Sequence, residues 1–294
     1  MRSFVAQLAE RVLGGQAPVV IGLDPRSEAM PDRVLPGASP VERFVDFYRL
    51  SLPVVARHAP CVKPNVAFFE YFGADGYRAY ERTCAIAKAH GLLVLGDIKR
   101  GDIGSTAEAY AEGHFRIADA VTLHPYLGGD SVQPFLAACH PDHGGKAVFV
   151  LVRTSNPGAR DFQDLAVGGE PLCDVVARAV TRWGTDLPRA EGYSPVGAVV
   201  GATWPHELAR LRALLPHSWL LLPGVGAQGG KVSDLAAAFD RRGLGALVTQ
   251  SRGVMQCFPP AATDWLERIE AAAKTFAAEC RSVAMLRSTV QGNS

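Results

Sequence analysis

The sequence predicts an α/β fold in which eight strands alternate with helices and close into one barrel. Three observations predict it: apolar, β-branched-rich runs recur eight times along the 294 residues, helical periodicity fills most of the gaps, and polar residues collect where the runs end. Strands that alternate with helices form right-handed βαβ units and a parallel sheet. Eight such units indicate a (β/α)8 or TIM barrel, with a doubly wound open sheet as the alternative.

Short apolar runs give the expected strands, and 3.6-residue periodicity gives the helices between them. The strands are expected at residues 19–23, 61–68, 92–95, 120–123, 147–152, 196–200, 219–222 and 246–249. The clearest helical segments are residues 74–89, 106–117, 171–183, 206–215 and 232–241. Ahead of the first strand, Phe4, Val5, Leu8 and Val12 have the spacing of an amphipathic helix, which Glu10 distinguishes from a signal peptide.

The chain is expected to form a single domain over residues 1–294. No repeat, low-complexity tract or linker divides it, and the polar end at residues 288–294 is expected to fray. Residues 26–43 make the first crossover long, and the sequence assigns them no role.

Composition limits the classes of function. Hydrophobic residues make up 48% of the chain, charged residues 20%, and the formal net charge is +1. This favours a soluble globular protein with no general attraction to nucleic acid or membrane, and no apolar run approaches the ~18–20 residues that cross a bilayer. The six cysteines form no C-x-x-C motif, so we expect free thiols. With no export signal, a cytoplasmic location is the simplest expectation.

The most informative stretch follows the third apolar run. Residues 97–106 read D-I-K-R-G-D-I-G-S-T. Side chains alternate faces along a strand, so Asp97 and Lys99 are expected to point the same way, with Asp102 in the next loop or helical turn. The charges therefore collect at the carboxyl end of a strand, where α/β folds bind substrate. A structural ion pair with a capping Asp102 is the plain alternative.

Other polar residues follow the remaining strands. Asp24 comes after the first, His124 after the fourth and Ser155 after the fifth. Lys63 lies inside the apolar second strand, where a buried lysine requires a charged partner. Asp24 could instead start a turn, and His124 is more often a rim histidine than a catalyst.

A glycine-rich loop and an arginine predict an anion site. Residues 223–230 read P-G-V-G-A-Q-G-G, which matches neither the Walker motif nor the dinucleotide motif. Glycines free backbone N–H groups to meet an anion, and barrels often bind phosphate after strands seven and eight. Arg252, after the eighth strand, would supply a bidentate grip on phosphate.

Together these residues resemble the orotidine 5′-phosphate decarboxylase family in its longer bacterial form, type 2. The resemblance runs from about residue 19 to residue 254. The D-x-K-x-x-D motif is shared by a wider group of phosphate-binding barrels, and Asp24, Lys63, Ser155, residues 223–228 and Arg252 make the resemblance specific. Ser251, where many shorter relatives have glycine, departs from the pattern.

The resemblance implies decarboxylation of orotidine 5′-phosphate to UMP, the last step of de novo UMP biosynthesis, with neither metal nor cofactor. Asp97 would lie near the substrate carboxylate, and Lys99 would deliver the proton. Asp24 and Lys63 would hold the ribose, and Lys63 would also join Lys99, Asp97 and Asp102 in the charged catalytic network. The other implied roles are pyrimidine contact by Ser155 and phosphate binding by Pro223, Gln228 and Arg252. Asp102 and Thr106 would reach the partner subunit's site, which implies a homodimer with shared active sites.

Two other functions remain open. Sugar-phosphate decarboxylases or aldolases of the same superfamily share D-x-K-x-x-D but use Mg²⁺, which needs an acidic ligand at strand two, where this chain has Lys63. A non-catalytic phosphate-binding barrel would keep the glycine loop and Arg252 but would have no use for the charged array.

Overall fold

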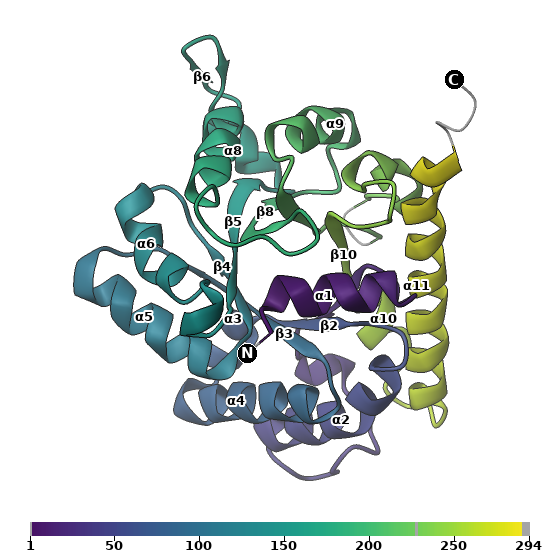
Figure 1. The fold of residues 1–294 in the computed structure, drawn as a ribbon. Helices are drawn as coiled ribbons and strands as arrows, with labels where there is room; N and C mark the ends of the chain where they lie inside the picture. Colours follow the sequence, from purple (N-terminus) through teal and green to yellow (C-terminus); the bar gives the residue numbers. More distant parts are fainter. Residues whose placement is uncertain (1, 227–228, 290–294) are drawn as a thin grey trace.

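The computed structural model describes residues 2–226 and 229–289, and within them eight parallel strands close into a barrel (Figure 1). The order around the barrel is β1 (Val19–Leu23), β10 (Ala246–Gln250), β9 (Ser218–Leu222), β8 (Ser194–Val200), β5 (Ala147–Arg153), β4 (Ala120–Leu123), β3 (Leu93–Arg100) and β2 (Cys61–Pro64). The predicted (β/α)8 barrel is confirmed, and the open-sheet alternative is wrong.

The barrel strands are buried on both faces, and this is why the sequence shows apolar runs rather than an alternating pattern. In β1 the side chains of Val19 and Ile21 pack outward against the helices, whereas Val20 points into the barrel. In β3, Leu93 and Leu95 point inward in the same way. The inward register therefore continues to Asp97, two residues beyond Leu95.

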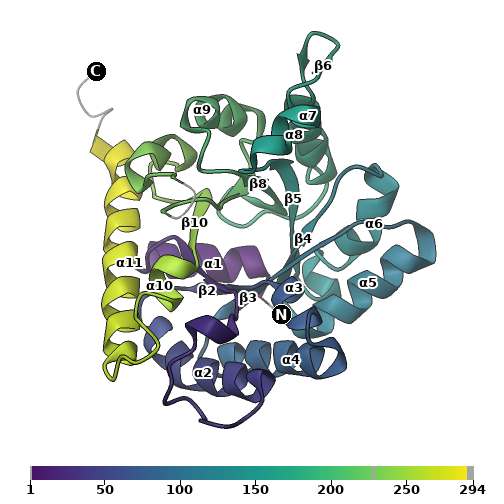
Figure 2. The ribbon, with the colours of Figure 1, turned by 180° about the vertical axis from the view of Figure 1, so that it is seen from behind.

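Helices surround the barrel on the outside, as Figures 1 and 2 show from opposite sides. The longer ones are α2 (Pro40–Val55), α4 (Gly73–Ala89), α5 (Gly104–Ile117), α6 (Gly129–Ala137), α8 (Leu172–Trp183), α9 (Pro205–Leu214) and α11 (Trp265–Thr289). Short elements in the loops are α3 (Val66–Glu70), α7 (Arg160–Gln163), α10 (Arg252–Met255) and the 3₁₀ helices η1 (Ser27–Ala29), η2 (Pro141–His143), η3 (Pro157–Ala159) and η4 (Val232–Ala238).

The predicted N-terminal helix, α1 (Phe4–Leu13), covers the amino-terminal end of the barrel. Its apolar side joins the inner core, and the Phe4 ring meets the Phe149 ring edge-on with 6.2 Å between centroids. Phe4 N–H donates to the carbonyl of Gly145, just ahead of β5, and Arg11 donates to the carbonyl of Pro60, just ahead of β2. This end of the barrel is therefore covered, and only the opposite end, where the strands finish, can be open to a ligand.

Three predicted boundaries were wrong. The run at 61–68 is not one strand, because Asn65 ends β2 and caps α3, its side chain accepting from Ala67 N–H at 3.3 Å. β3 extends to Arg100, so Asp97 and Lys99 lie within the strand rather than after it. The segment at 232–241 forms the 3₁₀ helix η4 over Val232–Ala238.

The structure also describes most of the C-terminal segment and the long first crossover. Helix α11 continues through Thr289. The first two residues of the end that was expected to fray, 288 and 289, therefore belong to this helix, and residues 290–294 lie outside the described residues. In the long first crossover, Met30 and Val34 are buried and Arg43 donates to the carbonyls of Pro31 and Val34. The crossover therefore packs against the core just ahead of α2, and its last residues form the start of that helix.

A small antiparallel hairpin of β6 (Ala166–Val167) and β7 (Glu170–Pro171) projects from the barrel beside α8 (Figure 1). It was not predicted. Its two short strands lie outside the barrel sheet, and the residues before it, from Thr154 to Gln163, supply part of the wall of the cavity described next.

Candidate active site

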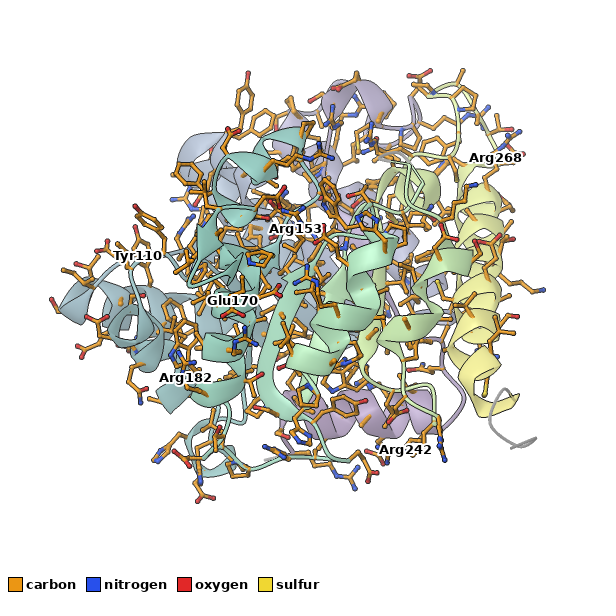
Figure 3. All side chains as sticks on the ribbon, turned by 90° about the horizontal axis from the view of Figure 1, so that it is seen from above. Tyr110, Arg153, Glu170, Arg182, Arg242 and Arg268 are labelled. Carbon is orange, nitrogen blue, oxygen red and sulfur yellow. The ribbon has the colours of Figure 1, made fainter. Side chains whose placement is uncertain are left out.

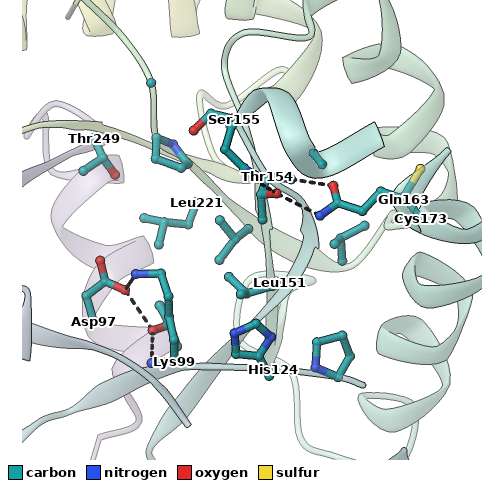
Figure 4. A pocket seen from close by; sticks show the side chains of 18 of the residues that line it. Asp97, Lys99, His124, Leu151, Thr154, Ser155, Gln163, Cys173, Leu221 and Thr249 are labelled. Carbon is teal, nitrogen blue, oxygen red and sulfur yellow. Dashed lines mark hydrogen bonds and ion pairs between the residues drawn. The ribbon is translucent and has the colours of Figure 1, made fainter. Parts of the chain in front are cut away.

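A cavity of about 1140 Å³ opens at the carboxyl ends of the barrel strands (Figure 4). Loops that follow β1, β4, β5, β9 and β10 contribute to its wall. The predicted site residues that line it are Asp24, Lys63, Asp97, Lys99, Ser155, Pro223 and Arg252. Residues separated by more than two hundred positions in the sequence thus share one space, as the barrel topology predicts.

Asp97 lies at the centre of a charged cluster on the inner wall. Its Oδ2 is 2.5 Å from Lys63 Nζ, and its Oδ1 is 2.5 Å from Lys99 Nζ. The side chains of Asp97 and Lys63 are each only 8% exposed, whereas that of Lys99 is 45% exposed and reaches into the cavity. One carboxylate therefore holds two ammonium groups, one buried and one available to a ligand.

The charges of this cluster stabilise one another. Burial alone would raise the pKa of Asp97, but Lys63 and Lys99 outweigh burial and hold that pKa well below its usual range. Burial alone would lower the pKa of Lys63, yet the carboxylates of Asp97 and then Asp24 raise it above its ordinary value. Asp97 and Lys63 are therefore both charged at neutral pH.

The backbone of Lys99 adopts an unusual conformation. Its φ is +45°, in the left-handed region that non-glycine residues rarely enter. Its N–H donates to Thr122 Oγ1 at 3.0 Å, and that hydroxyl donates to Asp97 Oδ1 at 3.0 Å. The pairing register between β3 and β4 also shifts between Gly96 and Arg100. Strain of this kind persists where surrounding contacts hold it, and often at functional positions.

Two polar atoms on the cavity wall have no hydrogen-bond partner within the described part of the chain. They are Asp24 Oδ1 and Thr249 Oγ1, both buried. A buried acceptor or hydroxyl without a partner costs free energy, and a bound ligand can supply that partner. Asp24 is thus suited to accept a hydrogen bond from a ligand hydroxyl.

The glycine-rich loop and Arg252 lie on the same cavity. Gly224 and Gly226 adopt φ values of +107° and +76°, which suit glycine, and Gly230 N–H donates back to the carbonyl of Gly224. Arg252 begins α10, is exposed, and forms no ion pair with any residue that the structure describes. Its guanidinium is therefore available to an anion. The predicted phosphate contact Gln228 lies outside the described residues.

The departure from the family pattern at Ser251 has a structural counterpart in Gly22. A Cβ atom on Gly22 would lie 1.8 Å from Ser251 Oγ, so glycine in β1 leaves the space that the serine side chain fills. Ser251 and Gly22 are therefore matched, and Arg252 follows a serine without distortion of β1.

Two predicted residues do not reach the cavity in this single chain. Asp102 accepts a hydrogen bond from the N–H of Ile103 at 2.9 Å, and Thr106 is exposed on the first turn of α5. Neither lines the cavity. Between them, Ile103 exposes 58% of its surface, which is high for an isoleucine.

Sequence reasoning missed several wall residues. Thr122 and Thr249 point inward from β4 and β10, and no motif identifies them because each is a small residue inside an apolar run. Gln163, which is bonded to Thr154 in the loop after β5, was also missed (Figure 4). His124 does line the cavity. Burial, and to a lesser extent the charge of Lys99, lowers the pKa of His124, so its imidazole is neutral at pH 7.

Across residues 2–226 and 229–289, no three His, Cys, Asp or Glu side chains come together in a way that could hold a metal ion. No helix in the same ranges is long and apolar enough to span a membrane.

Comparisons with known proteins agree on one family. The orotidine 5′-phosphate decarboxylase / HUMPS family profile matches residues 17–262. An orotidine 5′-phosphate decarboxylase of Rhodopirellula baltica is 42% identical over 87% of this chain and 89% of the relative. One from Deinococcus radiodurans is 43% identical over 86% and 89%.

Solved structures lead to the same family. A putative orotidine-monophosphate-decarboxylase from Toxoplasma gondii has a TM-score of 0.84 and 34% identity, covering 98% of this chain and 99% of its own. The Leishmania donovani UMP synthase has a TM-score of 0.79 and 37% identity. Its match covers 97% of this chain and 57% of that longer protein.

Proposed function

Because the chain belongs to the orotidine 5′-phosphate decarboxylase / HUMPS family, we propose that it converts orotidine 5′-phosphate to UMP, completing de novo UMP biosynthesis. Relatives more than 40% identical over most of both chains carry that name. The observation that carries the proposal is the buried Asp97 carboxylate held between Lys63 and Lys99 on the cavity wall.

The chemistry requires a fixed arrangement of charge. When the bond between the ring carbon and the carboxylate breaks, CO₂ leaves and the electron pair stays on a carbon with no adjacent electron sink. A preorganised cation beside that carbon stabilises the developing carbanion more than the substrate. Lys99 supplies this cation and then transfers a proton from Nζ to the ring carbon, which gives UMP.

Asp97 and Lys63 prepare Lys99 for this role. In the proposed complex Asp97 faces the substrate carboxylate, and loss of CO₂ relieves the repulsion between the two carboxylates. Its two oxygens are fixed by Lys63, Lys99 and Thr122, so it cannot turn away from the ligand. The array reaches its catalytic geometry before the substrate binds, and little reorganisation is needed during the reaction.

The remaining wall residues bind the nucleotide. Asp24 and Lys63 hold the ribose hydroxyls, and Ser155 contacts the pyrimidine. Asp24 Oδ1, which has no partner among the described residues, accepts a hydrogen bond from one of these hydroxyls. Arg252 holds the phosphate, together with Pro223 of the glycine-rich loop and Gln228. Binding energy from the phosphate, far from the reacting carbon, contributes to catalysis when it brings loops into place over the ring.

A homodimer with shared sites completes the proposal. Asp102 and Thr106 lie next to the exposed side chain of Ile103 and outside the cavity of their own chain. A second copy packed on this surface would bury Ile103 and bring Asp102 and Thr106 to the partner subunit's cavity.

The reaction is proposed to need neither metal nor cofactor. In the sugar-phosphate branch a divalent cation would need an acidic ligand at strand two, and here the ammonium of Lys63, held on Asp97, would repel it.

The direct test follows the ultraviolet absorbance of orotidine 5′-phosphate with purified protein in excess chelator. Conversion to UMP at an undiminished rate is expected. Activity lost with chelator and restored by Mg²⁺ would favour the sugar-phosphate alternative, and no conversion under any condition would contradict the proposed function.

A further inference from the structure

We propose that Gln163 is a positioning residue, which clips the loop after β5 onto Thr154 and thereby fixes Ser155 at the pyrimidine. The inference rests on the proposed function for the role of Ser155. Gln163 affects the reaction through Ser155, and it need not contact the reacting carbon itself.

The clip consists of two hydrogen bonds between Gln163 and Thr154, one to the main-chain N–H and one to the hydroxyl of Thr154. Gln163 Oε1 accepts from Thr154 N–H at 2.9 Å, and Gln163 Nε2 donates to Thr154 Oγ1 at 2.8 Å. The same hydroxyl donates to Asn156 Oδ1 at 2.7 Å. The pair joins the first residue of the loop to the last residue of α7, so the loop between them is closed at its base.

The third polar group of Thr154 is also bound. Trp204, at the start of α9, donates from Nε1 to the Thr154 carbonyl at 2.9 Å. The amide, carbonyl and hydroxyl of Thr154 are thus all engaged, and the backbone direction that leads into Ser155 is set.

A buried arginine at the end of β5 supports this arrangement. Arg153 ends β5, is 1% exposed, and lies inside the molecule while Arg182 and Arg242 lie at its edge (Figure 3). Its guanidinium is 4.2 Å from the centre of the Trp204 ring and pairs with Asp164, the residue after Gln163, and with Glu207. Arg153 therefore supports both residues of the clip, because it precedes Thr154 in the chain and pairs with the residue that follows Gln163.

Most of the clipped loop is exposed, apart from the buried Ala159. Asn156, Pro157, Gly158 and Phe162 are exposed, yet Ser155, Asn156, Gly158 and Phe162 all line the cavity. A loop with few buried contacts loses conformational freedom only if its ends are fixed, and closure of its base supplies that constraint. Without the clip, Ser155 would sample positions that no longer face the pyrimidine.

The test is a double-mutant cycle in kcat/KM for orotidine 5′-phosphate. Gln163→Met keeps length and removes both hydrogen bonds, each worth about 2- to 12-fold in an equilibrium. We expect a loss of about tenfold, and a similar loss for Thr154→Val but not for Thr154→Ser. Gln133→Met, an exposed glutamine on α6 away from the cavity, is the matched control and should change nothing.

The cycle then asks whether Gln163 acts through Ser155. In the Ser155→Ala background, Gln163→Met should cost less than about threefold, because the group it positions is already gone. Fully additive losses, or a Ser155→Ala variant with wild-type kcat/KM, would overturn the proposal even if melting temperatures fall.

A second readout needs no substrate. The Thr154 amide should exchange with deuterium about tenfold faster in Gln163→Met than in Gln133→Met. Unchanged exchange would overturn the clip. If the wild-type protein fails to decarboxylate the substrate while the two variants show this exchange difference, the proposed function is contradicted and the clip is not.

Discussion

The main-chain N–H of Lys99 donates to Thr122 Oγ1 at 3.0 Å, across from β3 to β4, while Lys99 itself has a φ of +45°. A non-glycine residue in that region costs on the order of 1–3 kcal/mol. The hydroxyl of Thr122 also donates to Asp97 Oδ1. One small side chain on the neighbouring strand therefore holds both the strained backbone of the lysine and the carboxylate with which it pairs.

Thr122→Val should impair turnover far more than Thr122→Ser. Valine keeps the shape but removes two hydrogen bonds, one of them to a charged group and worth about 1.5–3 kcal/mol. We expect kcat to fall about 10- to 100-fold in Thr122→Val and to stay within about threefold of wild type in Thr122→Ser. Steady-state kinetics on folded, purified variants checks this, and equal kcat values would refute the role given to Thr122.

Acid should remove the stability that Asp97 provides. Its folded pKa is lowered, so its contribution is present above the unfolded value of about 3.9 and is lost as pH falls towards the folded value. The raised pKa of Lys63 makes that lysine's contribution present below about 10.4 and lost above its folded value. Between these limits the contributions of the two groups are constant.

The measurement is urea unfolding of wild type and Asp97→Asn from pH 2 to pH 9. The difference in the free energy of unfolding should be steady from about pH 6 to pH 9 and should shrink below about pH 5. A difference that grows on acidification would mean that Asp97 is not held as the charged form.

Arg252→Ala should weaken the use of a phosphorylated substrate specifically. The charge-assisted hydrogen bonds removed are worth roughly 1.5–3 kcal/mol, or about 10- to 150-fold. The loss in kcat/KM should be at least that large for orotidine 5′-phosphate and small for orotidine, which has no phosphate. Arg182→Ala on α8 is the surface control. Equal losses on both substrates would make Arg252 a structural residue.

Mixing two inactive variants should restore activity if sites are shared between subunits. Lys99→Ala and Asp102→Ala are each expected to be inactive alone. After dissociation and reassociation, heterodimers would have one site with both wild-type residues and one with neither. We expect roughly a quarter of wild-type activity from a statistical mixture. Subunit exchange shown by labelled chains, without recovered activity, would contradict the assignment of Asp102.

Most of the barrel could be predicted because its strands are buried on both faces and therefore stand out as apolar runs. The error at residues 61–68 came from the same signal: Val66 and Phe69 of α3 are buried too, and only Asn65 marks the break. Helix α2 carries a readable start in Ser39, Pro40 and Glu42, which form a capping box with proline in the first turn.

The site could be predicted where a charged residue stands in or after an apolar run, as Lys63 and Asp97 do. The buried Lys63 was expected to have a charged partner, but no pattern identified Asp97, 34 positions away, as that partner. Thr122 and the Gln163–Thr154 bonds had no such signal, since neutral polar residues are common in strands and loops. The positive φ of Lys99 lies within the register shift between β3 and β4, which no local pattern encodes.

The central claim, that Lys99 is the proton donor in a preorganised charged array, is tested most directly by Lys99→Ala. Turnover is measured by ultraviolet absorbance and UMP affinity by calorimetry, with circular dichroism for folding and Lys274→Ala on α11 as the exposed-lysine control. General acid catalysis alone contributes about 10²–10⁴-fold. The account predicts a folded Lys99→Ala protein that still binds UMP and has less than about a hundredth of wild-type turnover. A folded variant that retains more than that would contradict it.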